Sequence, residues 1–114
     1  MNLSTKEKLK ESVANIRNKY PDRIPVFVTR SKQDKNLKEI NQNKFIVPED
    51  ITIGQFMSIL RKRIELTPEM AMFVFINGIL PAQSSTMATL YEAHKNQDGL
   101  LEIEYCGENS FGNI

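Results

Sequence analysis

The spacing of hydrophobic residues near the start of the chain predicts an amphipathic helix over residues 5–19. Ser4 and Glu7 have the separation of a capping box, and Pro21 halts the pattern. The hydrophobic positions recur three or four residues apart, at Leu9, Val13, Ile16 and Tyr20. One side of this helix is therefore expected to pack against the rest of the protein.

A second hydrophobic pattern, in the middle of the chain, predicts the main helix of the fold. Thr52 and Gln55 again have capping-box spacing. The expected buried face follows at Ile53, Phe56, Met57, Leu60 and Ile64. Basic residues at positions 61–63 fall in the last turn, where positive side chains complement the helix dipole.

Alternation of residue type predicts two strands between these helices. The first has a core face at Ile24, Val26 and Val28 and a second face at Pro25, Phe27 and Thr29. Residues 30–43 are polar and predict a surface loop. Residues 44–47 form a β-prone run that Pro48 halts, and proline is typical of a sheet edge. We therefore expect an accessible edge strand at residues 44–47.

The last third of the chain predicts a hairpin, a short helix and a final strand. Asn77-Gly78 separates two hydrophobic runs and is a strong hairpin signal, because both residues tolerate positive φ. Residues 84–86 offer caps for a short helix expected to end near Gly99. The final strand has hydrophobic Leu101, Ile103 and Tyr105 alternating with Glu102 and Glu104.

This order of elements predicts one domain of the α+β class. A main helix is expected to cross a four-stranded mixed sheet. An N-terminal helical extension at residues 1–20 precedes the domain at residues 21–106, and residues 107–114 form a tail. Ubiquitin-like β-grasp folds have this order of elements, as do other small α+β domains.

Composition narrows the possible functions. The chain has 114 residues, of which 40% are hydrophobic and 25% charged, as in ordinary globular domains. No apolar run approaches the roughly 18–20 residues of a membrane helix and no signal peptide is recognised, so a cytoplasmic protein is expected. One cysteine and one histidine exclude an internal disulfide and a structural zinc site, and neither metal nor cofactor is expected.

Charge is distributed unevenly, although the net charge is only +1. Residues 1–35 carry nine basic and four acidic side chains, whereas residues 65–114 carry one basic and seven acidic ones. Such asymmetry orients a protein toward partners or an anionic membrane, or else the charges belong to ordinary solvated faces. Because no basic stripe with interleaved aromatic residues is present, nucleic-acid binding is not expected.

The chain ends in a polar, glycine-bearing segment that predicts a mobile tail. Gly112 lacks a Cβ, so it can thread a narrow enzyme channel and offer an unhindered carboxylate. Taken alone, however, a glycine near a terminus is weak evidence, and an ordinary chain end is the better explanation. An enzyme would need a nucleophile and a base, for which only Cys106 and His94 qualify. Cys106 continues a buried strand pattern, where a thiol usually serves packing, so the chain is not expected to be an enzyme.

Several longer stretches of the sequence are together highly specific for one protein family. They are residues 16–26 (IRNKYPDRIPV), 44–48 (KFIVP), 52–56 (TIGQF), 59–64 (ILRKRI), 85–87 (STM) and 90–91 (LY). Through these stretches the chain resembles the autophagy family of ubiquitin-like modifiers that includes GABARAP. The resemblance extends from about Ile16 to Gly112. The resemblance implies a ubiquitin-like β-grasp fold. The sequence before Tyr20 is shorter than in GABARAP, so the first short helix of the family is expected to be missing or reduced.

The resemblance implies that Gly112 is the functional end of the chain. A dedicated cysteine protease would cut after the Phe111-Gly112 pair, before Asn113. Activating and conjugating enzymes would then carry Gly112 as a thioester and join it to phosphatidylethanolamine on autophagosomal membranes. Two acyl chains bury enough CH₂ groups, at ~0.8 kcal/mol each, to anchor the protein. From the residues alone, two alternatives remain. Gly112 could be joined to a lysine of another protein, or the chain could be an adaptor in vesicle trafficking that is never conjugated.

The resemblance also implies a groove for cargo receptors with an aromatic-x-x-aliphatic motif, which would add a strand to the edge strand. The implied aromatic pocket consists of Ile16, Pro25, Phe27, Lys44, Ile46 and Leu100. The implied aliphatic pocket consists of Phe45, Val47, Pro48, Ile51, Phe56 and Ile59, with Arg63 nearby and Arg23 also in the groove. Charged substitutions of Phe27 or Phe56 are expected to weaken motif binding and to leave the fold intact.

Overall fold

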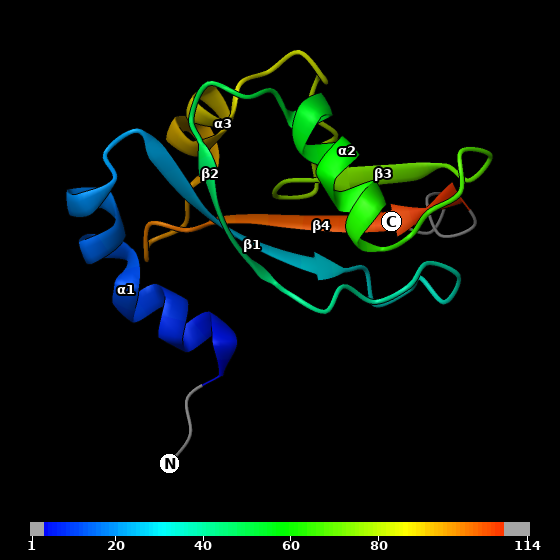
Figure 1. Cartoon of the computed structure of the whole chain (residues 1–114), viewed down its shortest axis with the longest axis horizontal. Coiled ribbons are helices and arrows are strands. Elements are labelled where there is room, and N and C mark those ends of the chain that lie inside the picture. The colour runs from blue at the N-terminus through cyan, green and yellow to red at the C-terminus, as the bar shows by residue number, and fades with distance from the viewer. Residues whose placement is uncertain (1–3, 109–114) are drawn as a thin grey trace.

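Seven helices and strands follow one another in the predicted order in the computed structural model, which describes residues 4–108 (Figure 1). The helices are α1 (Thr5–Lys19), α2 (Ile53–Arg63) and α3 (Met87–His94). The strands are β1 (Arg23–Arg30), β2 (Lys44–Pro48), β3 (Met72–Phe75) and β4 (Leu101–Gly107). The predicted α+β class, with a helix ahead of the sheet, is confirmed.

The four strands form one mixed sheet in the order β2-β1-β4-β3. Strand β1 pairs antiparallel with β2 and parallel with β4, and β3 pairs antiparallel with β4. The last strand of the chain therefore lies inside the sheet, and β2 lies at one edge. The predictions of a mixed sheet and of an edge strand at residues 44–47 are confirmed.

The main core lies between α2 and one face of the sheet, called the inner face below (Figure 1). The predicted capping box forms: Thr52 Oγ1 accepts from the Gln55 N–H at 3.1 Å, and Gln55 Oε1 accepts from the Thr52 N–H at 2.9 Å. The helix then buries Ile53, Phe56 and Leu60 against the alternate β1 residues Ile24, Val26 and Val28. Removal of this apolar surface from water, at about 25 cal/mol per Å², is the main stabilising contribution.

A smaller hydrophobic cluster, called the α1 cluster below, lies on the opposite, outer face of the sheet. Strand alternation turns Phe27 away from the main core, and Phe27 packs there together with Ile46. The buried members of the α1 cluster are Leu9, Val13, Ile16 and Leu100. Helix α1 begins where predicted, because Ser4 Oγ accepts from the Glu7 N–H at 3.1 Å. Two helices thus cover the two faces of β1.

The predicted hairpin forms only as a turn. Asn77 and Gly78 have φ values of 52° and 74°, as the sequence indicated. Ile76 and Ile79 then exchange both backbone hydrogen bonds at 2.9 Å, but they make an isolated bridge and no second strand follows. The physical reason is exposure: Ile79 and Leu80 are 55% and 51% exposed, so no packing extends the pairing.

The predicted end of α3 and the predicted burial of Tyr20 need correction, whereas α1 ends at Lys19 as predicted. Helix α3 ends at His94 and not near Gly99, because the Asn96 side chain organises the following loop. Its Oδ1 accepts from the backbone N–H groups of Asp98 and Leu100, a local competition with the helix that is typical of asparagine. Tyr20 does not join the buried face of α1 but caps the helix end, and is 40% exposed.

The polar loop between β1 and β2 has no helix or strand, as predicted, but it holds the end of β4 in place. The Asp34 carboxylate is almost fully buried and accepts from the Gly107 N–H at 3.2 Å. The Tyr105 hydroxyl donates to the Lys38 carbonyl at 2.7 Å. Strand β4 ends at Gly107, one residue beyond the predicted domain boundary at Cys106. The hydrogen bond to Asp34 holds this end of the strand in place.

Candidate functional site

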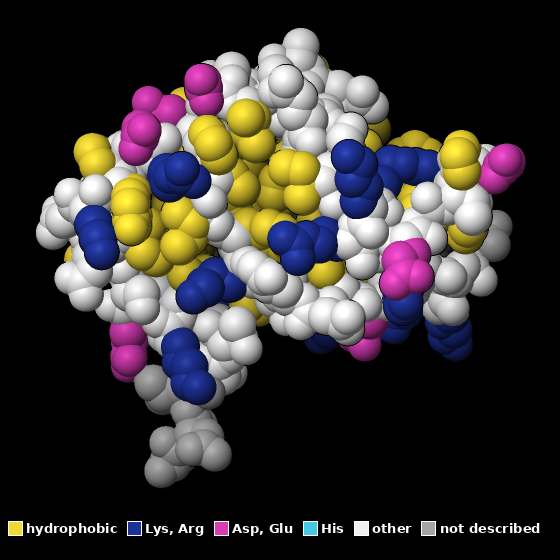
Figure 2. Space-filling view, in the orientation of Figure 1, with side chains coloured by type: hydrophobic (Ala, Val, Ile, Leu, Met, Phe, Trp, Pro, Cys, Tyr) yellow, Lys and Arg dark blue, Asp and Glu magenta, His cyan; other side chains and the backbone are white. Residues whose placement is uncertain are grey.

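The edge strand β2 separates two hydrophobic patches on the surface. Phe45 and Val47 face the main core, and Ile46 faces the α1 cluster. Figure 2 shows hydrophobic side chains gathered in two areas, one beside α1 and one between β2 and α2, with Lys and Arg side chains around them. Within residues 4–108 β2 has one neighbouring strand, so its other edge faces outward.

The residues assigned to the aromatic pocket come together around the α1 cluster. Ile16 and Leu100 are buried, and Phe27 and Ile46 are partly buried against them. Pro25 is buried on β1, and Lys44 is exposed at the start of β2. The exposed parts of Phe27 and Ile46 therefore form an apolar surface between α1 and β2, with a lysine at its margin.

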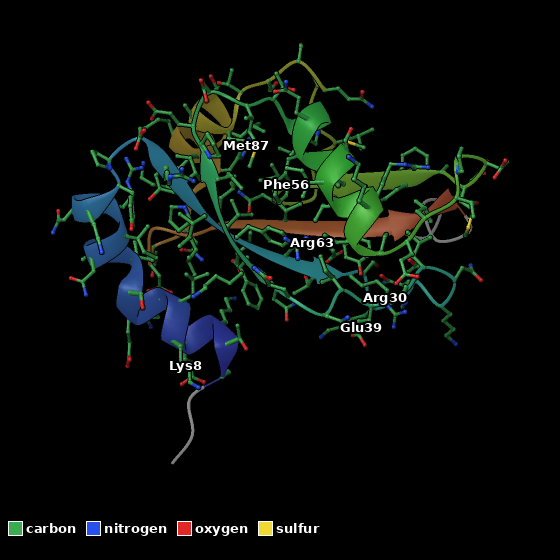
Figure 3. All side chains as sticks on the ribbon, in the orientation of Figure 1. Lys8, Arg30, Glu39, Phe56, Arg63 and Met87 are labelled. Atoms are coloured by element: carbon green, nitrogen blue, oxygen red, sulfur yellow. The ribbon has the colours of Figure 1, made fainter. Side chains whose placement is uncertain are left out.

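The residues assigned to the aliphatic pocket divide into core and surface. Phe56, which is labelled in Figure 3, belongs to the main core together with Phe45 and Val47. The rings of Phe45 and Phe56 meet edge to face with centroids 5.4 Å apart. Ile51 packs on this core from the surface, and Ile59 is 39% exposed. Ile51 and Ile59 therefore each present apolar surface outside this core.

Phe56 requires a correction of the sequence-based prediction. Its side chain is completely buried, on the same face of α2 as Leu60. A charged residue at position 56 would have to enter the main core, where an unpaired charge costs several kcal/mol or more. The expectation that such a variant keeps its fold is wrong, and Ile59 is the position on α2 where groove contacts can be changed separately from folding.

Basic side chains surround the two patches. The Arg63 guanidinium lies 5.8 Å from the centroid of the Phe45 ring, a cation–π contact. Arg23 and Pro48 are exposed, and the Arg23 carbonyl accepts from Arg17 Nη1 at 2.6 Å. A partner whose hydrophobic side chains enter the patches would therefore meet positive charge beside them.

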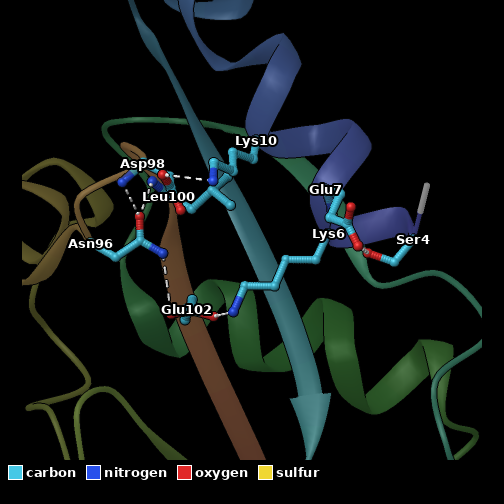
Figure 4. Close-up of polar contacts among 8 residues, drawn as sticks. All are labelled: Ser4, Lys6, Glu7, Lys10, Asn96, Asp98, Leu100 and Glu102. Atoms are coloured by element: carbon cyan, nitrogen blue, oxygen red, sulfur yellow. Dashed lines mark hydrogen bonds and ion pairs between the residues drawn. The ribbon is translucent and has the colours of Figure 1, made fainter.

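The contacts that hold α1 on the outer face could not be predicted from the sequence. The Lys6 ammonium forms an ion pair with Glu102, and the Lys10 ammonium lies 3.5 Å from an Asp98 oxygen (Figure 4). Burial raises the pKa of Glu102, but hydrogen bonds from Lys6 and Asn96 outweigh burial and leave that pKa below its usual range. The only signal in the sequence is that Lys6 and Lys10 are four residues apart and so share one helix face.

The two residues considered for thiol chemistry, Cys106 and His94, lie on different elements, β4 and α3. Cys106 is completely buried, and burial together with Asp34 and Glu104 raises the pKa of its thiol. A thiol with a raised pKa is a poor nucleophile at neutral pH. His94 is the last residue of α3, and its Nδ1 lies 3.4 Å from the Asn77 amide nitrogen.

The predicted processing site lies outside the described residues. Phe111, Gly112 and Asn113 follow the last described residue, Glu108. Among residues 4–108 no group of three metal-ligating side chains occurs. The helices in this range are all too short or too polar to cross a bilayer.

Comparisons with known proteins identify the family. The family model described as autophagy protein Atg8, ubiquitin like, matches residues 7–112. Autophagy-related protein 8 of Schizosaccharomyces pombe is 50% identical over 109 residues, which are 95% of this chain and 88% of that protein. Autophagy-related protein 8d of Arabidopsis thaliana is 48% identical over 106 residues, which are 93% and 88% of the two chains.

A solved structure gives the same result for the fold. The crystal structure of Trypanosoma brucei ATG8 superposes with a TM-score of 0.83 at 38% sequence identity, and the match covers 92% of this chain and 90% of that one. The predicted ubiquitin-like fold is therefore confirmed. From the family model and from relatives of this identity and coverage, we conclude that the chain belongs to the Atg8 family of ubiquitin-like autophagy proteins.

Proposed function

We propose that this protein is an autophagy modifier that is attached to membranes through Gly112 and recruits cargo receptors through the surface around β2. A cysteine protease removes Asn113 and Ile114, and activating and conjugating enzymes join Gly112 to phosphatidylethanolamine. The protein itself catalyses no reaction. It moves in this way from the cytoplasm to the autophagosomal membrane.

The observation that carries the proposal is an open edge strand between two hydrophobic patches. The backbone groups on the outer edge of β2 can pair with an extended peptide. Side chains of such a peptide point alternately to its two sides, so an aromatic residue and an aliphatic residue three positions later reach different patches. Phe27 and Ile46 would receive the aromatic side chain, and Ile51 and Ile59 the aliphatic one.

Attachment through Gly112 is supported by the placement of the preceding strand. The β4 end is held by Asp34 and by the Tyr105–Lys38 hydrogen bond, whereas the recruiting surface lies at the β2 edge. Figure 1 shows β4 running away from α1 toward the opposite end of the sheet. Attachment of the tail therefore leaves the groove accessible.

Substitution in the groove tests recruitment. Titration calorimetry with an aromatic-x-x-aliphatic peptide should show at least tenfold weaker binding for Ile59→Glu, because a carboxylate replaces an apolar contact and must be desolvated. Ile79→Glu is a matched control, since Ile79 is also exposed but lies beyond β3 at the other sheet edge. Unchanged affinity of a folded Ile59→Glu protein would refute the groove.

Intact-mass measurement tests processing and conjugation. After incubation with cell extract, the wild-type chain should lose the mass of Asn113 and Ile114 and should then gain the mass of the lipid. Gly112→Ala should remain soluble in a membrane flotation assay. An unprocessed wild-type chain, next to a control substrate that is cleaved, would favour an adaptor that is never conjugated.

A further inference from the structure

We propose that the outer face of the sheet carries a second binding site, a cavity that takes a lysine or arginine side chain of a partner protein. The cavity has a volume of about 260 Å³ and lies against β1, β4 and the end of β3. Its main walls are Phe27, Thr29, Phe75, Asn77, Glu102 and Glu104. Only Phe27 is shared with the groove around β2, and the inference does not depend on the function proposed for that groove.

The strand register brings aromatic and acidic side chains together in this cavity. Phe27 stands opposite Glu102 in the β1–β4 ladder, and Glu104 stands opposite Phe75 in the β3–β4 ladder. Residues opposite each other in a sheet project from the same face. Glu102 and Glu104 are two positions apart on one strand, roughly 7 Å, so one cation between them can contact both carboxylates.

Lys6 indicates the chemistry of the ligand, because its own ammonium already lies at one side of the cavity. The Nζ atom pairs with Glu102 and lies 5.9 Å from the centroid of the Phe27 ring. Figure 4 shows the Lys6 side chain reaching from α1 across β1 to Glu102. A cation on an aliphatic stem, placed between a carboxylate and a ring, is thus an arrangement that this surface already stabilises.

Lys6 neutralises only one of the two carboxylates in the cavity, that of Glu102. Glu104 is exposed, and among residues 4–108 no cation forms an ion pair with it. The two carboxylates repel each other, and one ammonium leaves a net negative charge beside the Phe75 ring. A second cation would compensate that charge, and its methylene groups would lie against the partly exposed cavity walls at Phe27 and Thr29, as long basic side chains do on apolar surface. A basic side chain of a partner supplies both the positive charge and the methylene groups.

The test is a titration of the ¹⁵N-labelled full chain with two short peptides, followed by NMR. One is acetyl-Gly-Arg-Gly-amide, and the other has citrulline, which is nearly isosteric and neutral, in place of arginine. The arginine peptide should shift the amides of Thr29, Phe75 and Glu104, and the citrulline peptide should not. Equal shifts with both peptides would overturn the proposal, because they would exclude charge recognition.

Variants locate the binding within the cavity. Glu104→Gln should weaken binding of the arginine peptide about fivefold, as for the loss of one partly exposed ion pair. Lys6→Ala should strengthen it severalfold by freeing Glu102, whereas Lys8→Ala, which removes an exposed α1 cation without such contacts, should not (Figure 3). The ¹⁵N spectra report whether each variant is folded. An unchanged affinity of folded Glu104→Gln, or no shifts in Lys6→Ala at the highest soluble peptide concentration, would refute the site.

Discussion

The two hydrophobic clusters on either side of β1 differ in how they are stabilised. The main core is built from α2, α3 and the inner sheet face, and its largest side chains, such as Phe56, are completely buried. The α1 cluster has four buried members, its Phe27 and Ile46 are only partly covered, and ion pairs of exposed side chains hold its helix. The inner face therefore determines the fold, and the outer face leaves apolar surface for partners.

The largest effect should come from a cavity in the main core. Phe56→Ala should lower the free energy of unfolding by about 3–5 kcal/mol, because a buried ring is lost and its partner Phe45 cannot fill the space. Ile59→Ala, on the exposed side of the same helix, should cost less than about 1 kcal/mol. Urea unfolding of both variants measures the difference, and similar losses would contradict the division of α2 into a core side and a groove side.

Most of this main core could be predicted from the sequence, because its elements carry regular patterns. The Thr52 capping box and the alternation at Val26 and Val28 require only local spacing. Helical spacing, however, does not show how deeply each position is buried, and Phe56, which the family resemblance places in a pocket wall, is completely buried. The role proposed for Gly112 rests only on the family resemblance, because a glycine near a chain end has no distinctive pattern.

Contacts between distant residues could not be predicted. Lys6 and Glu102 are almost a full chain length apart, and nothing near either residue indicates that they meet. Asp34 likewise has no sequence pattern that sets it apart from the rest of its loop, yet it is buried and accepts a hydrogen bond from the Gly107 N–H. Parallel pairing of β1 with β4 produces both contacts, and that pairing depends on how the whole chain folds.

A second, smaller effect should follow from a cavity in the α1 cluster. Leu9 is almost completely buried, but the helix around it can shift and partly fill the space, so Leu9→Ala should cost about 2 kcal/mol. The loss should appear as faster amide hydrogen exchange in α1, with little change in α2. If amide hydrogen exchange becomes faster in α1 and α2 alike, the two clusters unfold as one cooperative unit, and the outer cluster is not separately stabilised.

A still smaller effect is expected from the loop that borders the α1 cluster. Gly99 has a φ of 79°, and a Cβ added there would lie 2.9 Å from Val13 Cγ1. Gly99→Ala should therefore cost about 1–2 kcal/mol through backbone strain and push α1 outward. Gly78→Ala is a suitable control, since its φ is also positive but no atom lies within 4 Å of an added Cβ. The excess destabilisation of Gly99→Ala over Gly78→Ala, measured by urea unfolding, isolates the contact with α1.

The smallest effect should be the dependence of α1 docking on pH. The pKa of Glu102 is below its usual value, so protonation of this carboxylate is less favourable in the folded protein. Its contribution to stability is therefore complete above about pH 4.3 and is lost as the pH falls through the lowered pKa. Because the Lys6 and Glu102 side chains are 46% and 41% exposed, solvent screening limits the contribution to about 0.5 kcal/mol.

The pH effect can be separated from that of other carboxylates by a matched variant. Glu102→Gln keeps the shape of the side chain and the possibility of a hydrogen bond, but it removes the titrating charge. The stability difference between wild type and Glu102→Gln, from urea unfolding, should be largest at pH 6 and should decrease as the pH falls below about 4.3. Addition of salt at pH 6 should reduce the same difference, because the ion pair is exposed. A difference that is constant across pH would mean that the charge of Glu102 does not stabilise the docking of α1, and this ion pair would then not distinguish the α1 cluster from the main core.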